Sequence, residues 1–105
     1  GLAFKENCPD LRNSRVIDVI TELRKYNVLV DVHDPWVNDE NAAAEYGIEL
    51  VETPEPGTYD AVIVAVAHDQ FREAGPSGLR GLCRPDGILY DVKCLLPADA
   101  VDGRL

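Results

Sequence analysis

The stretch 60-DAVIVAVAH-68 is the most apolar run of the chain, and apolar and polar residues do not alternate within it. A strand that is buried on both faces of a parallel sheet has this composition. The run therefore predicts the central strand of such a sheet, with residues 61–67 the most buried. His68 ends the run at the edge where open α/β sheets bind ligands. A capping or packing role is the favoured interpretation for His68, and a ligand contact stays open.

Strands and helices are predicted to alternate on both sides of this run. The predicted strands are residues 2–4, 28–33, 48–52, 60–68 and 88–93, and the predicted helices are residues 14–26, 38–47 and 69–74, with a turn or helix over 78–87. This order predicts an α/β fold with right-handed crossovers, a Rossmann-like open parallel sheet flanked by helices. The first strand is short, and we expect it to be truncated.

Composition excludes several classes of function. The chain has 105 residues and a net charge of −9, which argues against a nucleic-acid surface because phosphate binding needs a basic face. No apolar run approaches the roughly 20 residues of a membrane helix. The three cysteines are an odd number at irregular spacing, which favours reduced thiols in the cytoplasm over a disulfide framework. No two of them have the spacing of metal ligands, so the sequence predicts no metal site.

The chain contains no methionine, so an initiator residue is missing from it. Its first strand also looks like the end of a strand that begins further upstream. We therefore expect residues 1–105 to form one domain of a longer protein.

The segment before the first predicted helix carries two cations, Lys5 and Arg12, in an otherwise acidic chain. The start of that helix, at residues 13–14, offers free N–H groups and the positive end of the helix dipole. Together these features predict an anion site. The alternative is that Lys5 and Arg12 only form ion pairs with Glu6 and Asp10, and composition alone favours neither interpretation.

Three further residues lie in loops at the carboxyl ends of predicted strands or beside the cations. Asp34 occupies the position where dinucleotide-binding folds place an acid for the ribose, but the G-x-G-x-x-G fingerprint is missing from the preceding loop. Cys8 lies near the two cations, yet the sequence shows no partner histidine for a nucleophilic role. Lys93 stands at the carboxyl end of the last clear strand, where a ligand would bind.

The opening stretch GLAFKENCPDLRNS resembles the start of the C-terminal domain in the UDP-glucose/GDP-mannose dehydrogenase family, whose pattern is G-[LFT]-[AST]-[FY]-K-x(4)-D-x-R-x-S. The matching residues are Gly1, Phe4, Lys5, Asp10, Arg12 and Ser14. Three later stretches, VDVHDPWV, YDAVIVAVAHDQF and YDVKCLL, are similar to further family motifs. The resemblance covers essentially the whole chain.

The resemblance implies part of an enzyme that oxidises the C6 alcohol of a nucleotide sugar to a carboxylate with NAD. Such enzymes have an N-terminal NAD-binding domain, a central helical dimerisation domain and a C-terminal domain that binds the UDP-sugar. Their catalytic cysteine lies in an upstream G-G-x-C-x-P segment, which is missing here, and Cys8 does not match it. We therefore expect no catalytic residue in this chain, no activity from the chain alone, and a homo-oligomer at full length.

The resemblance also implies roles for single residues. Lys5 would approach the sugar or its phosphate, Phe4 would shape the same side, and Arg12 would reach the pyrophosphate of NAD held by the missing domain. Lys93 stands where many relatives have an arginine that contacts the nucleotide sugar. The residues of these motifs are most similar to those of the family branch that acts on UDP-N-acetylhexosamines for bacterial surface polysaccharides.

Two other classes of function compete with this interpretation. The first is a stand-alone nucleotide-binding or regulatory α/β module, such as a receiver-like domain. Receiver domains need acidic residues after the first strand, where this chain has Lys5 and Glu6. The second is a thiol enzyme that uses Cys8, which lacks a base.

Overall fold

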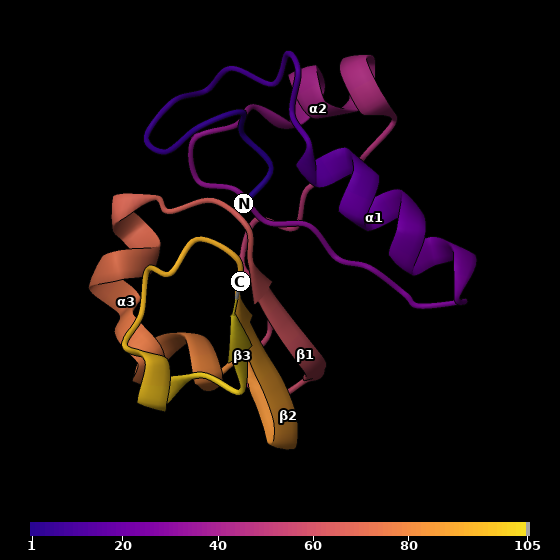
Figure 1. Cartoon of the computed structure of the whole chain (residues 1–105). Coiled ribbons are helices and arrows are strands. Elements are labelled where there is room, and N and C mark those ends of the chain that lie inside the picture. Colours follow the sequence, from indigo (N-terminus) through magenta and orange to yellow (C-terminus); the bar gives the residue numbers. More distant parts are fainter. Residues whose placement is uncertain (105) are drawn as a thin grey trace. The chain divides into compact units, whose positions relative to one another are not determined.

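The computed structural model describes residues 1–104, and these residues form two compact units, Gly1–Thr53 and residues 54–104. The helices and strands are α1 (Val16–Lys25), α2 (Asp39–Tyr46), β1 (Tyr59–Val64), α3 (Asp69–Arg80), β2 (Cys83–Asp91), a 3₁₀ turn (Ala98–Ala100) and β3 (Gly103–Arg104), as Figure 1 shows. The first unit contains α1 and α2, and the second contains the remaining elements. The order of strands and helices confirms the predicted α/β class.

The second unit is built on a three-stranded parallel sheet with the order β1-β2-β3. The prediction of a central strand at residues 60–68 is therefore wrong in position: β2 is the central strand of this sheet, and β1 lies at its edge. Ala61 is exposed, whereas Val64 is buried. The apolar run is most buried after β1 has ended, because residues 65–68 continue it into the interior.

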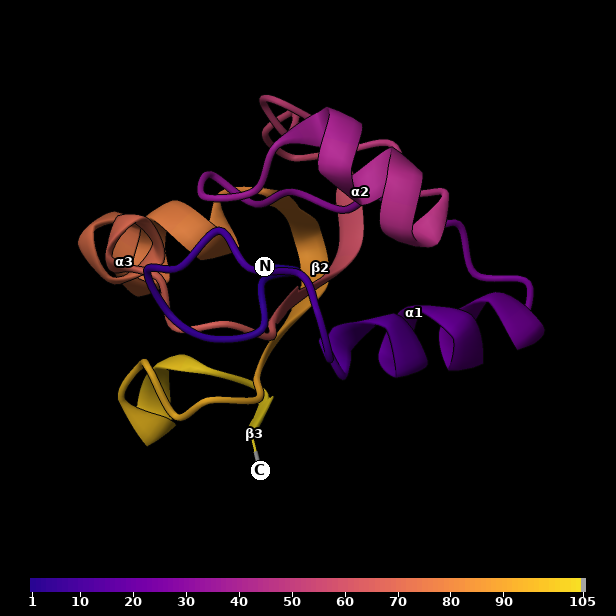
Figure 2. The ribbon, with the colours of Figure 1, turned by 90° about the horizontal axis from the view of Figure 1, so that it is seen from above.

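Helix α3 lies to one side of β1 and β2 in both Figure 1 and Figure 2. Its residues Phe71 and Leu79 contribute to a buried cluster with the strand residues Val64 and Leu89 and with Leu96. The helix extends beyond the predicted residues 69–74 because two helical segments join at a kink.

The kink in α3 lies at Gly75, whose backbone adopts φ 68° and ψ −179°. A positive φ costs a residue with a side chain more than it costs glycine, and the proline that follows, Pro76, cannot donate the N–H of a regular helix. The sequence pair Gly-Pro therefore produces a bend between two helical segments, and it does not end the helix.

Strand β2 begins five residues earlier than predicted. Tyr59 pairs with Cys83 and Ala61 pairs with Ile88, so residues 84–87 lie between two consecutive pairs of the ladder. This segment, Arg-Pro-Asp-Gly, contains proline, aspartate and glycine, which are residues that favour turns. It forms an irregularity inside the strand where a separating turn was expected.

The first unit holds α1 and α2 close to their predicted positions. Asn38 caps α2 by accepting hydrogen bonds from the N–H groups of Glu40 and Asn41, and Gly47 ends the helix in the left-handed conformation with φ 66°. Left-handed C-caps favour glycine because it has no Cβ to clash. The core of this unit consists of Leu2, Ala3, Leu11, Ile20, Val32, Val37, Ala42 and Ile48.

The predicted strands of the first unit are largely wrong. Residues 28–33 and 48–52 contribute only one parallel bridge, between Val32 and Leu50, and residues 2–4 form no strand in the described chain. The N–H groups of Leu2 and Ala3 donate instead to a side chain, the carboxylate of Asp34. The β-branched composition of residues 28–33 favours a strand, but apart from the Val32–Leu50 bridge no ladder of partners accompanies it in the described chain.

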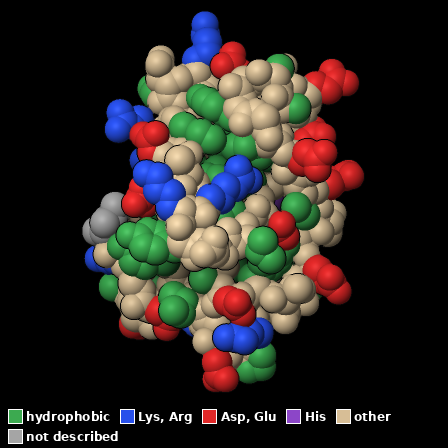
Figure 3. Space-filling model, turned by 90° about the vertical axis from the view of Figure 1, so that its right-hand side faces the viewer, with side chains coloured by type: hydrophobic (Ala, Val, Ile, Leu, Met, Phe, Trp, Pro, Cys, Tyr) green, Lys and Arg blue, Asp and Glu red, His purple; other side chains and the backbone are tan. Residues whose placement is uncertain are grey.

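Surface charge follows the composition. On the face drawn in Figure 3, Lys and Arg side chains lie singly or in small groups among Asp and Glu side chains. None of the helices in residues 1–104 has the length and apolar character needed to cross a bilayer.

Asp102 links β2 to the C-terminal segment, and its charge makes the stability of the second unit dependent on pH. Its Oδ2 accepts hydrogen bonds from the Leu89 N–H (2.8 Å) and from Arg80 Nη1 (3.0 Å). These bonds, the Leu89 bond first, lower the pKa of Asp102 from its ordinary value of 3.8. A carboxylate whose pKa is depressed on folding stabilises the fold above the unfolded-state pKa, and that contribution disappears as the pH falls through the folded-state pKa.

We therefore expect Asp102→Asn to lower the urea midpoint of unfolding at pH 7, and the difference from the unaltered chain to shrink below a pH of about 3.8. The control is Asp99→Asn, because the Asp99 carboxylate has no hydrogen bond or ion pair within residues 1–104. A difference between Asp102→Asn and the unaltered chain that stays constant from pH 7 to pH 2 would contradict the assignment.

Candidate functional site

The segment that carries Phe4 and Lys5 is fixed by hydrogen bonds to its backbone. The N–H groups of Leu2 and Ala3 both donate to Asp34 Oδ2, at 2.6 and 2.9 Å. The Leu2 carbonyl accepts a bond of 2.6 Å from Ser14 Oγ, and the Phe4 N–H donates to a backbone carbonyl at 2.7 Å. Phe4 and Lys5 are exposed. The fold therefore presents these two side chains from an anchored backbone.

Arg12 is held by Asp10 in a two-pronged ion pair. Arg12 Nε donates to Asp10 Oδ1 and Nη2 donates to Oδ2, each at 3.1 Å, and Oδ1 also accepts the Arg12 N–H at 2.9 Å. The hydrogen bonds from Arg12 lower the pKa of Asp10, and the positive charge of Lys5 lowers it further. The same pair raises the pKa of Arg12. The structure thus pairs Arg12 directly with Asp10, and Lys5 acts on this carboxylate only through its charge.

The alternative of simple ion pairing is confirmed for Arg12 and Asp10. Lys5 forms no ion pair in the described part of the chain, and the pairing with Glu6 is not observed there. The side chain of Arg12 is 79% exposed despite its ion pair, so its guanidinium faces solvent. Both cations are therefore accessible to a ligand, and the anion site stays a prediction.

The start of α1 is partly occupied by the chain itself. Ser14 Oγ accepts the Val16 N–H at 3.3 Å, while Asn13 adopts a left-handed backbone with φ 62°. Arg15 stands at the N-cap position without a capping side-chain bond and pairs with Asp18 at 3.0 Å. Ser14 therefore provides a side-chain acceptor for the first turn of α1, one residue earlier than the formal cap Arg15.

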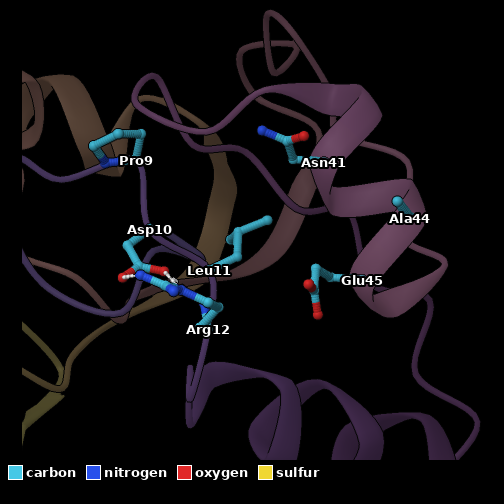
Figure 4. A pocket seen from close by; sticks show the side chains of 7 residues that line it. All are labelled: Pro9, Asp10, Leu11, Arg12, Asn41, Ala44 and Glu45. Carbon is cyan, nitrogen blue, oxygen red and sulfur yellow. Dashed lines mark hydrogen bonds and ion pairs between the residues drawn. The ribbon is translucent and has the colours of Figure 1, made fainter.

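A shallow pocket of about 230 Å³ lies beside Arg12 (Figure 4). Leu11 points into the space between the loop residues Asp10 and Arg12 on one side and α2 on the other. The pocket is lined by Pro9, Asp10, Leu11, Arg12, Asn41, Ala44 and Glu45. The negative charge of Glu45 contributes to the raised pKa of Arg12, so the cation has carboxylates on both sides.

Asn41 and Glu45 line this pocket and were not singled out from the sequence. They lie four residues apart on α2, a spacing that places both on one face of a helix. That spacing was visible in the sequence, but nothing there showed that this face lies opposite residues 9–12.

Asp34, at the position where dinucleotide-binding folds place an acid for the ribose, is buried in the first unit. The residue is only 5% exposed, and its oxygens accept the N–H groups of Leu2, Ala3 and Trp36. His68 is completely buried and its ring lies 5.5 Å from that of Phe71. The packing role that was favoured for His68 is therefore confirmed.

Lys93 lies in the loop after β2 and is exposed. Its N–H donates to Asp91 Oδ1 at 3.1 Å, and Asp91 Oδ2 accepts the Leu96 N–H at 2.7 Å. Asp91 has no exposed surface, so a buried carboxylate shapes the loop that presents Lys93. Asp91 was not singled out from the sequence, although an aspartate at the end of an apolar strand was a visible signal.

The cysteines show three different environments. Cys83 is buried, and burial raises the pKa of its thiol; Cys8 is half-buried and Cys94 is exposed. All three are free thiols. Across residues 1–104, no group of three or more histidine, cysteine or acidic side chains is placed to hold a metal ion.

Comparison with known proteins gives one family over nearly the whole chain. Residues 1–98 match the UDP-glucose/GDP-mannose dehydrogenase family, UDP binding domain. The chain is 53% identical over 105 residues to the UDP-N-acetyl-D-glucosamine 6-dehydrogenase of Pseudomonas aeruginosa, and 50% identical over 105 residues to the protein of the same name from Salmonella typhi. It is 37% identical over 102 residues to Protein CapL of Staphylococcus aureus.

The matches cover this chain almost completely and the relatives only in part. They include 100% of the chain for the first two relatives and 97% for the third. The chain spans about a quarter of the length of each relative, 25%, 25% and 24%.

Proposed function

Since this chain belongs to the UDP-glucose/GDP-mannose dehydrogenase family as a UDP binding domain, we propose that it binds the UDP-sugar of an NAD-dependent UDP-N-acetylhexosamine 6-dehydrogenase. The observation that carries the proposal is the identity of 53% over all 105 residues with a UDP-N-acetyl-D-glucosamine 6-dehydrogenase. The complete enzyme would oxidise the sugar C6 alcohol to a carboxylate for surface polysaccharide synthesis. Its other domains are the partners of this chain, and we propose a homo-oligomer at full length.

In this proposal the chain holds and orients the UDP-sugar and supplies no catalytic residue. Lys5, exposed at the end of an anchored backbone, would approach the sugar or its phosphate, with Phe4 beside it. Lys93 would contact the nucleotide sugar as a point charge, because an ammonium lacks the planar fork of the arginine found in many relatives. The free thiols fit a reducing compartment, which supports a cytoplasmic location.

The residues of this chain fit only a minor share of NAD binding. Arg12 is exposed and positively charged, so it suits contact with a pyrophosphate. Asp34 does not suit a ribose, because it is buried and its oxygens accept backbone N–H groups. NAD accepts a hydride when it is bound. We propose that residues outside this chain hold most of NAD and that Arg12 adds one cation.

The proposal predicts separable effects for the two cations. Removing one charged hydrogen bond costs about 1.5–3 kcal/mol in binding, or roughly a 10- to 100-fold loss of affinity. We expect Lys5→Ala to weaken UDP-N-acetylglucosamine binding by this factor and to leave NAD nearly unchanged, and Arg12→Ala to do the reverse. Isothermal titration calorimetry on the full-length protein measures both affinities.

The matched control is Lys25→Ala, which removes an exposed lysine of the same unit that pairs with Glu22 at 3.3 Å. Equal or negligible effects of Lys5→Ala and Arg12→Ala on both ligands would refute the assignment. A loss of affinity in the Lys25→Ala control would show that net charge, and not position, governs binding.

A further inference from the structure

Asp34 makes an unusual set of contacts for a buried carboxylate. Its Oδ2 accepts the N–H groups of Leu2 and Ala3, and its Oδ1 accepts the N–H of Trp36 at 2.8 Å. An ionised carboxylate is an acceptor only, so it suits three converging N–H donors better than an amide does. Hydrogen bonds to a charged acceptor are also shorter and stronger than neutral ones. Asp34 therefore ties residues 2–3 to the turn at residues 34–36.

The same segment is held from a second side. Ser14 Oγ donates to the Leu2 carbonyl at 2.6 Å, and Ser14 is itself buried. Leu2 and Ala3 are buried as well, at 0% and 1% exposure. The Phe4 N–H adds a bond of 2.7 Å to the Asp10 carbonyl, so the backbone is held up to the residue immediately before the exposed Lys5.

We infer that Asp34 is a positioning residue for the UDP-sugar site, fixing the backbone from which Lys5 reaches the ligand. The inference rests on the proposed function of Lys5. A lysine side chain is a flexible stem, so the placement of its ammonium depends on where its backbone is held. Misplacing a binding group by about 1 Å can reduce activity 100-fold. Asp34 acts through Lys5 and does not itself contact the ligand.

A double-mutant cycle in the full-length protein tests this action through Lys5. We expect Asp34→Asn to weaken UDP-N-acetylglucosamine binding by about 10-fold when Lys5 is present, and by less than about 2-fold in the Lys5→Ala background. NAD affinity should stay within about 2-fold in all variants, so KM for the UDP-sugar rises without a matching rise for NAD. Amide hydrogen exchange at residues 2–4 should become faster in Asp34→Asn.

The control Asp39→Asn makes the same chemical change in the same unit. Asp39 Oδ1 accepts the Leu50 N–H at 2.8 Å, and within residues 1–104 Asp39 forms no hydrogen bond or ion pair with residues 2–5, so this variant should bind both ligands normally. Ser14→Ala serves as a second variant if Asp34→Asn does not fold. It removes the bond to the Leu2 carbonyl and should show the same dependence on Lys5.

The outcomes separate the inference from the proposed function. If Lys5→Ala loses UDP-sugar affinity but Asp34→Asn and Ser14→Ala do not, the inference is overturned and the proposed function stands. Equal losses in the presence and absence of Lys5 also overturn it, because they show that Asp34 supports the fold generally. If the unaltered protein does not bind the UDP-sugar, both fail.

Discussion

Leu89→Ala is expected to lower the free energy of unfolding of the chain by about 2–5 kcal/mol. Leu89 lies in the central strand β2, has 0% exposed surface and belongs to the buried cluster that includes Val64 and Phe71. Truncation of the side chain removes apolar contacts and leaves a cavity. Because β2 is hydrogen-bonded to β1 and to β3, the strand cannot move to close this cavity. The measurement is urea unfolding followed by circular dichroism.

The neighbouring residue supplies the control for this prediction. Ile88 precedes Leu89 in the same strand, but it is 51% exposed because successive side chains point to opposite faces. Ile88→Ala should therefore lower the free energy of unfolding clearly less than Leu89→Ala does. Similar costs for the two variants would show that this sheet is covered differently from the structure described here.

Asp91→Ala is expected to lower the free energy of unfolding by about 1.5–4.5 kcal/mol, since it leaves the buried Leu96 N–H and the partly buried Lys93 N–H without their acceptor. The Asp91 carboxylate has no exposed surface and accepts the N–H groups of Lys93 and Leu96. A buried donor left unsatisfied costs about 1–3 kcal/mol, and the loss of the second hydrogen bond adds about 0.5–1.5 kcal/mol, which together give this range. Thermal and urea unfolding measure the loss.

Two further substitutions make the Asp91 prediction specific. Asp91→Asn keeps an acceptor oxygen for one of the two N–H groups, so its free energy of unfolding should lie between those of the unaltered chain and Asp91→Ala. Asp99→Ala removes an exposed carboxylate nearby on the chain and should leave stability nearly unchanged. If Asp91→Ala unfolds no more easily than Asp99→Ala, the loop that presents Lys93 does not depend on a buried carboxylate.

The two buried aspartates, Asp34 and Asp91, have the same local geometry. Asp34 follows the predicted strand 28–33 and Asp91 is the last residue of β2, and each accepts the N–H of the residue two positions later, Trp36 or Lys93. Each also accepts an N–H from elsewhere in its own unit, which fixes the loop that follows the strand. A short acidic side chain is well suited to this turn. The aspartates thus connect the loops at the ends of extended segments to the interior.

The sequence by itself determined the α/β class, the family, and the positions of α1 and α2. These features depend on local periodicity, on turn residues such as Gly47, and on a motif with fixed spacing, all of which are encoded in neighbouring residues. The pairing of Asp10 with Arg12 belongs here too, because the residues are two positions apart. It was stated as one of two alternatives, and geometry decided between them for Arg12.

Only the tertiary structure decided which extended segments pair and which buried acids hold loops. Strand pairing needs a partner at the correct distance, and the partners of residues 28–33 and 48–52 are reduced to the single bridge between Val32 and Leu50. Similarly, the contact of Asp34 with Leu2 spans 32 positions of sequence, so no local pattern predicts it. A carboxylate looks the same in the sequence whether it faces a ligand or buried backbone N–H groups, and only its burial and its donors distinguish the two.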